Sequence, residues 1–176
     1  MKSLRSTLFI LTVLALTWPA FAQDKKPRVS PHETVNATVD GAKISIVYGR
    51  PYTKDPKSGE MRKVWGTLVP YDKVWRMGAD EATILTTDKD ITIGGTAIKA
   101  GSYSLYLMPS ASSAKLIVNK QTGQWGTKYD ESQDLARIDM KKEAAAKAAD
   151  QFTIAVDGGM LKLTWENTQY SAAIKG

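Results

Sequence analysis

Short runs in which apolar and polar residues alternate extend over most of the chain, and turn-forming residues separate them. Residues 43–48 place Ile44, Ile46 and Tyr48 on one face, which is typical of a β-strand with one buried side. Further strands are predicted over residues 83–87, 91–93, 96–98, 102–108, 115–119 and 136–140. In residues 102–108 both alternating sets are bulky, so we expect that strand to be covered on both faces.

Two Gly-Gly pairs predict tight β-hairpins, because glycine reaches the positive φ values that such turns require. Gly94-Gly95 joins residues 91–93 to residues 96–98. Around Gly158-Gly159, a two-residue turn would put three apolar pairs on one face: Val156 with Leu161, Ile154 with Leu163, and Phe152 with Trp165. A slip of one residue would turn this set towards water, so the register is well specified.

Residues 141–150 interrupt the alternation with strong helix formers, chiefly alanine and lysine, and we expect one short surface helix there. About eight or nine short strands with a single small helix predict an all-β fold. We expect a β-sandwich, of which a jelly-roll-like arrangement is one form, and a closed barrel is the alternative.

The first 22 residues have the features of a cleavable signal peptide. Lys2 and Arg5 precede an apolar run over residues 8–16, and Ala20-Phe21-Ala22 supplies the small residues of a cleavage site. The apolar run is shorter than the roughly 20 residues that span a bilayer. We therefore expect a bacterial protein that is periplasmic or secreted, with no membrane span after cleavage. A flexible lead-in over residues 23–31 and a single domain over residues 32–176 would remain.

Composition excludes several classes of function. The chain has no cysteine, which excludes disulfides, thiolate metal sites and a thiol nucleophile. Its formal net charge is +6, but the lysines are scattered among acids and form no basic stripe, so no nucleic-acid partner is expected. Glycine-rich phosphate loops, a nucleophile elbow and a His-Glu-x-x-His motif are absent from the sequence. The lone histidine, His32, is expected on the surface, and the sequence predicts no catalytic residue, metal or cofactor.

The densest group of candidate binding residues lies within residues 63–83. Aromatic planes, a guanidinium group and two adjacent carboxylates occur there among turn residues, which suits a carbohydrate or peptide ligand. Together with an arginine upstream and a tryptophan downstream, the candidate ligand-binding residues are Arg50, Trp75, Arg76, Asp80, Glu81 and Trp125. The alternative is a structural role, with the tryptophans in the core and Arg76 paired with an acid such as Glu81.

Several short motifs occur in a characteristic order: residues 48–51, 65–71, 74–83, 91–95, 100–105, 119–120, 124–126 and 163–168. The pattern Trp-Arg-x-Gly-Ala-x-Glu-Ala-Thr within residues 75–83 is the most specific of them. In these motifs the chain resembles an uncharacterised bacterial family, domain of unknown function 2911, from Ser30 to the C-terminus. The resemblance implies an exported β-rich domain with no established reaction. It also places Arg50, Trp75, Arg76 and Glu81 at positions within the family motifs.

Three functions are open at this point. The first is an exported, non-catalytic β-sandwich protein that binds a carbohydrate, a peptide or an envelope component. The second is a carboxylate-dependent hydrolase, although Asp80 and Glu81 would point to opposite faces of a strand and could converge only if Asp80 lies in a loop. The third is an envelope structural or assembly protein that binds through a strand edge. Convergence of Arg76, Asp80 and Glu81 in an open cleft would favour a site, whereas burial as ion pairs would favour structure.

Overall fold

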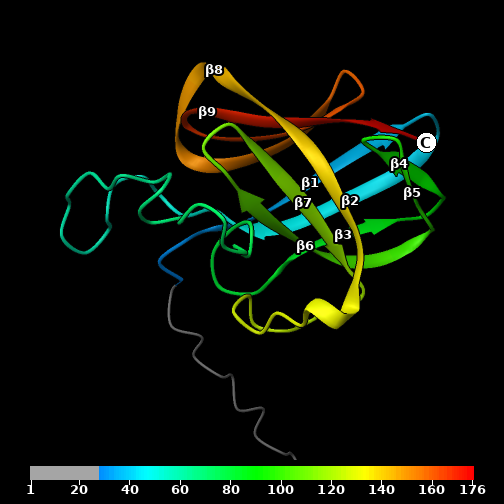
Figure 1. Ribbon diagram of the computed structural model, residues 1–176, viewed down its shortest axis with the longest axis horizontal. Helices are drawn as coiled ribbons and strands as arrows, with labels where there is room; N and C mark the ends of the chain where they lie inside the picture. Colours follow the sequence, from blue (N-terminus) through cyan, green and yellow to red (C-terminus); the bar gives the residue numbers. More distant parts are fainter. Residues whose placement is uncertain (1–27) are drawn as a thin grey trace, which may run out of the picture.

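The computed structural model describes residues 28–176. Nine strands form one antiparallel sheet in the order β1-β2-β3-β6-β7-β8-β9-β4-β5 (Figure 1). They are β1 (His32–Val39), β2 (Ala42–Gly49), β3 (Thr83–Thr87), β4 (Ile91–Ile93), β5 (Thr96–Ile98), β6 (Gly101–Pro109), β7 (Ser113–Asn119), β8 (Asp134–Asp157) and β9 (Met160–Lys175), and a short 3-10 helix, η1 (Glu131–Gln133), precedes β8. The predicted signal peptide and residues 23–27 of the predicted lead-in lie outside the described residues. Within residues 28–176, no helix has the length and apolar character needed to cross a membrane.

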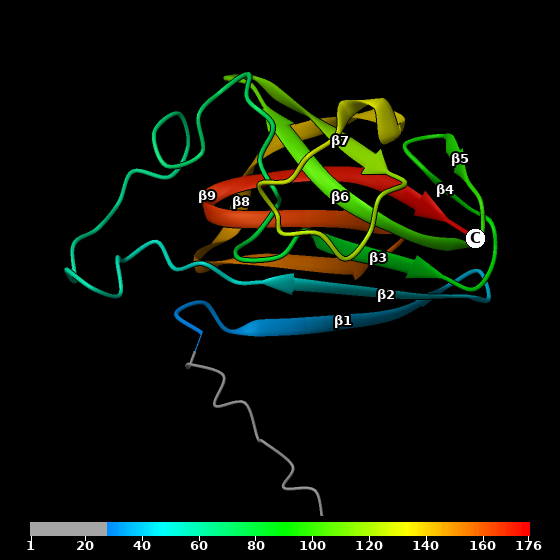
Figure 2. The same cartoon turned by 90° about the horizontal axis from the view of Figure 1, so that it is seen from below.

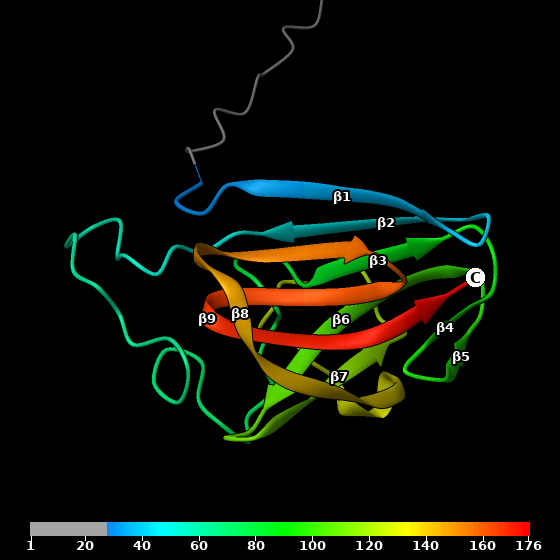
Figure 3. The ribbon, with the colours of Figure 1, turned by 90° about the horizontal axis from the view of Figure 1, so that it is seen from above.

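The sheet folds over on itself, so that the long strands β8 and β9 cover one face of β2, β3, β6 and β7 (Figures 2 and 3). Apolar side chains from both layers share one buried core, which includes Ile46 of β2, Leu105 of β6 and Leu163 of β9. The chain just after β2 also pairs with β8 through the bridge between Tyr52 and Gln151. The fold is therefore all-β, as predicted, and its two layers over a common core are those of a sandwich.

Both predicted glycine hairpins form. Ile93 faces Thr96 across Gly94-Gly95. Across Gly158-Gly159, the predicted register is present for two of the three apolar pairs, Val156 with Leu161 and Ile154 with Leu163. The register then shifts, but the rings of the third pair, Phe152 and Trp165, still lie 5.9 Å apart.

Strand β6 is covered on both faces, as the bulk of its two alternating sets predicted. Leu105 and Leu107 belong to the main core. Tyr106, on the opposite face, packs in a smaller cluster with Ala82 and Ile117.

The predicted surface helix over residues 141–150 was wrong, because this segment is the middle of β8. Lys142 pairs with Tyr170, whose side chain is fully buried, and irregularities interrupt the ladder between Ala144 and Thr153. Helix propensity favours a helix by only a fraction of a kcal/mol per residue, so cross-strand pairing on a buried neighbour outweighs it. The irregularities let β8 bend from one layer to the other (Figure 1).

The long connection between β2 and β3, residues 50–82, lies at the end of the sandwich opposite the C-terminus (Figures 1 and 2). Its apolar side chains close this end of the core: Val64, Trp65 and Met77 are buried in it. The indole N–H of Trp65 donates to the carbonyl of Trp165 at 3.3 Å. Because most of the candidate binding residues belong to this connection, its packing fixes where they lie.

Candidate functional site

A cleft of about 320 Å³ lies where the 50–82 connection meets the segment before β1. Three of the six candidate residues, Trp75, Arg76 and Asp80, line it together. Tyr52 and Leu68 add apolar and aromatic surface, and the buried Trp165 lies behind it. Residues that the sequence separates by more than a hundred positions therefore form one concave surface with both aromatic and charged groups.

The aromatic side of the cleft is held rigidly. The rings of Trp75 and Trp165 are stacked, with centroids 5.7 Å apart and planes 23° from parallel. Phe152 meets Trp75 edge to face at 4.9 Å. The indole N–H of Trp165 donates to the hydroxyl of Thr53 at 2.9 Å. The ring of Trp75 is thus held in place, and because Trp75 is only partly buried and lines the cleft, a ligand there would contact it without further ordering of the side chain.

Arg76 does not form the ion pair with Glu81 that one interpretation of the sequence predicted. Its Nε donates to the carbonyl of Gly78 at 3.3 Å, and no carboxylate in residues 28–176 lies within 4.0 Å of its guanidinium. Glu81 is instead bound by Arg28. A guanidinium keeps its charge and has five N–H donors, so most of the hydrogen-bonding capacity of Arg76 is open to a ligand or to water.

The backbone around Arg76 is strained. Met77 and Asp80 have φ values of 52° and 65°, in the left-handed region that bulky residues rarely adopt. Such a conformation costs on the order of 1–3 kcal/mol and persists only where the surroundings impose it. Here the hydroxyl of Thr83 donates to the carbonyl of Met77 at 2.7 Å, and the Met77 side chain is fully buried. Strain of this kind concentrates at binding and catalytic sites.

Glycines permit the close packing that holds this turn. A Cβ at Gly78 would lie 2.7 Å from the carbonyl oxygen of Gly49. A Cβ at Gly126 would lie 2.3 Å from Cδ of Arg76 and 2.8 Å from the carbonyl oxygen of Asp80. The Gly126 amide donates to that same carbonyl at 3.0 Å. The position of Arg76 is therefore fixed by backbone from two other segments of the chain.

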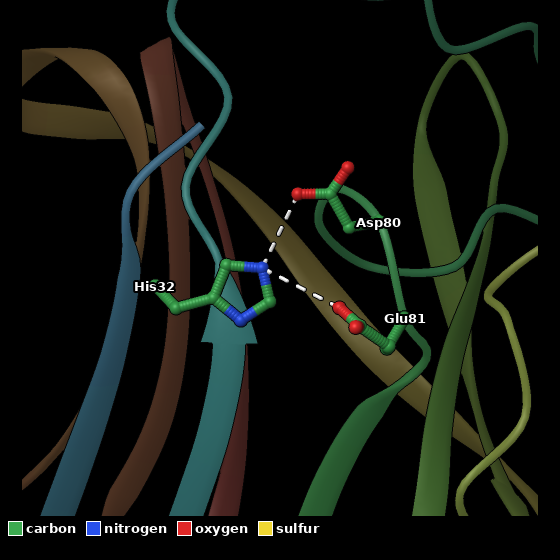
Figure 4. A group of neighbouring side chains, drawn as sticks. All are labelled: His32, Asp80 and Glu81. Atoms are coloured by element: carbon green, nitrogen blue, oxygen red, sulfur yellow. Dashed lines mark hydrogen bonds and ion pairs between the residues drawn. The ribbon is translucent and has the colours of Figure 1, made fainter. Parts of the chain in front are cut away.

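A charged cluster lies beside the cleft, since it includes Asp80 of the cleft lining. Figure 4 shows three of its side chains, His32, Asp80 and Glu81. His32, at the start of β1, has its Nε2 3.3 Å from Oδ2 of Asp80 and 3.6 Å from Oε2 of Glu81. The two neighbouring carboxylates face the same imidazole because Asp80 lies in the left-handed turn and not in a strand. The objection that adjacent acids must point to opposite faces therefore does not apply here.

Arg28 completes the cluster. Its Nη2 donates to Oε1 of Glu81 at 2.7 Å, and its Nη1 contacts Oε2 of the same carboxylate, so the pair is bidentate. Nη1 also lies 2.6 Å from Nε2 of His32. The hydrogen bond from Arg28 lowers the pKa of Glu81 to about 2, against a smaller opposing effect of burial.

The other three candidates do not line the cleft: Glu81 belongs to the charged cluster, and Arg50 and Trp125 lie elsewhere. Arg50 has a structural role: it donates to Glu33 at 2.5 Å, to the hydroxyl of Thr153 at 2.9 Å and to the carbonyl of Phe152 at 3.2 Å, and so it ties β1 to β8. The side chain of Trp125 is 50% exposed, and its backbone bridges that of Glu81. Trp125 is thus near the charged cluster without lining the cleft.

Sequence reasoning missed His32 and Arg28. His32 precedes its partner Asp80 by 48 positions, and Arg28 precedes Glu81 by 53. A prediction of β1 would have pointed to His32, because His32 is the first residue of that strand. In the β1–β2 register His32 lies opposite Gly49, whose carbonyl accepts from the Ala79 amide. That register depends on β1, which the hydrophobic pattern did not reveal.

The fold and the site define a class: an all-β sandwich domain whose longest connection builds a cleft and a charged cluster at one end of the strands. Residues 30–174 match the model of the family described as "Protein of unknown function (DUF2911)", and the chain belongs to this family. The match confirms the resemblance that the motifs of the sequence carried. No curated protein and no solved structure matches the chain significantly.

Proposed function

We propose that this is an exported, non-catalytic binding protein whose cleft takes a carbohydrate or peptide ligand with an acidic group. The observation that carries the proposal is Arg76, which lines the cleft with a backbone carbonyl as its hydrogen-bond partner and no carboxylate partner within residues 28–176. A guanidinium binds a carboxylate in a bidentate manner. Trp75 supplies an aromatic plane beside it, and Asp80 supplies an acceptor for hydroxyl or amide hydrogens.

Export is part of the proposal, and its support comes from the sequence. Lys2 and Arg5, the apolar run and Ala20-Phe21-Ala22 are the parts of a signal peptide. A protein that is periplasmic or secreted meets envelope glycans and peptides, which are the ligand classes that the cleft suits.

The charge of Glu81 argues against one of the two roles in a two-carboxylate hydrolase, that of the proton donor. A glycoside hydrolase of the two-carboxylate type needs one carboxyl group that stays protonated at the working pH, and burial usually raises its pKa. The convergence of Asp80 and Glu81 is compatible with such a pair, but Arg28 holds the pKa of Glu81 at about 2. Glu81 is therefore ionised near neutral pH and cannot donate a proton there.

Binding is tested with a panel of acidic and neutral glycans and of acidic peptides, by titration calorimetry on the wild type and on Arg76→Ala. We expect the wild type to prefer acidic members, and Arg76→Ala to lose that binding while its free energy of unfolding changes by less than about 0.5 kcal/mol. Arg137→Ala is the matched control, because Arg137 is paired with Asp134 and Glu131 outside the cleft. Equal ligand affinity in the two variants, or no binding by any member of the panel, would refute the proposal.

A further inference from the structure

The charged cluster has a second property, which goes beyond the proposed function and does not depend on the cleft ligand. We infer that His32, Asp80 and Glu81 form a binding site for a divalent transition-metal ion of the Zn²⁺ type, and that the guanidinium of Arg28 fills this site when no metal is bound. The inference rests on the spacing of the donor atoms, on the position of Arg28 and on the chemistry of the three ligands.

The donor atoms are already spaced for one ion. A Zn²⁺ ion bound at about 2.1 Å in tetrahedral geometry holds its ligand atoms about 3.4 Å apart. Nε2 of His32 lies 3.3 Å from Oδ2 of Asp80 and 3.6 Å from Oε2 of Glu81. One atom from each of the three residues lies within 4.8 Å of the other two. Small side-chain rotations would therefore bring all three donors onto one ion.

Arg28 shows that the cluster receives a cation. Its Nη1 lies 2.6 Å from Nε2 of His32, contacts Oε2 of Glu81 and lies 3.9 Å from Oδ2 of Asp80. One positively charged nitrogen thus lies within 4.0 Å of all three donor atoms, in the region that a shared metal ion would occupy. The four side chains are between 25% and 42% exposed, so an ion in solution can reach the cluster and displace the guanidinium.

The ligand set selects the kind of ion. One imidazole nitrogen and two carboxylate oxygens suit Zn²⁺ and Co²⁺, whereas Ca²⁺ and Mg²⁺ prefer six or more oxygen ligands. Three protein ligands leave a fourth position open, which is the arrangement of zinc sites that bind an exchangeable group. Asp80 also lines the cleft, so this open position lies at the rim of the proposed ligand site.

Metal binding is measured with Zn²⁺ by calorimetry and with Co²⁺ through its visible absorption spectrum. We expect one equivalent per chain, and an affinity about ten-fold tighter in Arg28→Ala, because the competing guanidinium is gone. His32→Ala and Asp80→Asn should lose the Co²⁺ spectrum and weaken Zn²⁺ binding at least about 100-fold. Asparagine tolerates the left-handed backbone at position 80, so Asp80→Asn keeps the turn.

Asp90→Asn is the matched control. Asp90 is a carboxylate paired with Lys99. It lies after β3, whereas Glu81 lies before that strand. Removal of the Asp90 carboxylate should therefore leave metal binding unchanged. The inference is overturned if neither the wild type nor Arg28→Ala binds Zn²⁺, or if binding survives both His32→Ala and Asp80→Asn. Arg76→Ala should keep the metal site, so a failure here is distinguishable from a failure of the proposed cleft ligand.

Discussion

Truncation of Trp165 to alanine tests how far the cleft depends on the core. The side chain is 1% exposed and contacts three aromatic rings, Trp65, Trp75 and Phe152, at centroid distances of 5.7 to 6.3 Å. Loss of a buried tryptophan costs about 3–5 kcal/mol through lost burial and the cavity that remains. The variant also removes the partner of the Thr53 hydroxyl. We therefore expect a loss near 5 kcal/mol, the upper end of that range.

Urea melts followed by far-UV circular dichroism measure this loss without relying on tryptophan fluorescence. Lys162→Ala is the control, because Lys162 lies on the opposite face of β9 and its ammonium group pairs with the exposed Asp157. The free energy of unfolding lost in this variant should stay below about 0.5 kcal/mol. Trp165→Phe keeps one ring against Trp75 and should fall between the two. Equal costs for Trp165→Ala and Lys162→Ala would refute the assignment of faces, and with it the packed aromatic side of the cleft.

Three further measurements have defined outcomes, two on variants and one on the exported wild type. Gly126→Ala should destabilise the fold by about 1–3 kcal/mol in urea melts and abolish ligand binding, because its methyl group would lie 2.3 Å from Cδ of Arg76. Arg28 lowers the pKa of Glu81 from 4.5 to about 2, so their interaction stabilises the folded chain fully above pH 4.5 and is lost as the pH falls towards 2. The stability difference between wild type and Arg28→Ala in acid melts should close over that interval, and a constant difference would contradict the pairing. Intact-mass measurement of exported protein should give a chain that begins at Gln23.

Several strands were predictable from the sequence because their apolar and polar residues alternate. Ile44, Ile46 and Tyr48 are all buried in β2, and β3 has the predicted bounds. The glycine hairpins were predictable for a different reason, since their turn conformations favour one residue type. Local pattern and tertiary burial agree at these positions, so the sequence alone is sufficient.

Prediction failed where the two disagree. β1 was not recognised, because its residues alternate only between exposed and half-buried, and Val35 and Val39 reach the core from an edge strand. Residues 141–150 carry helix-forming side chains on a strand that has to bend between layers. For residues 141–150 the decisive contact is with β9, whose paired residues lie well over ten positions further along the chain, and local propensity does not contain it. For β1 the partner is β2, which follows directly through the turn at Asp40-Gly41, so this hairpin had a local signal that the sequence analysis did not use.

The same distinction between local sequence and distant contacts applies to the candidate site. Trp75, Arg76 and Asp80 lie within one short motif, so residue types alone could place them together, and they do line one cleft. The partners of those residues could not be predicted from the motif. Glu81, the acid expected for Arg76, is bound by Arg28. His32 lies near Asp80 because β1 pairs with β2. Arg28 and Glu81 pair in the charged cluster, whereas Arg76 lines the cleft. Arg76 has a backbone carbonyl but no carboxylate as partner within residues 28–176, and the function proposed for the cleft depends on this arrangement.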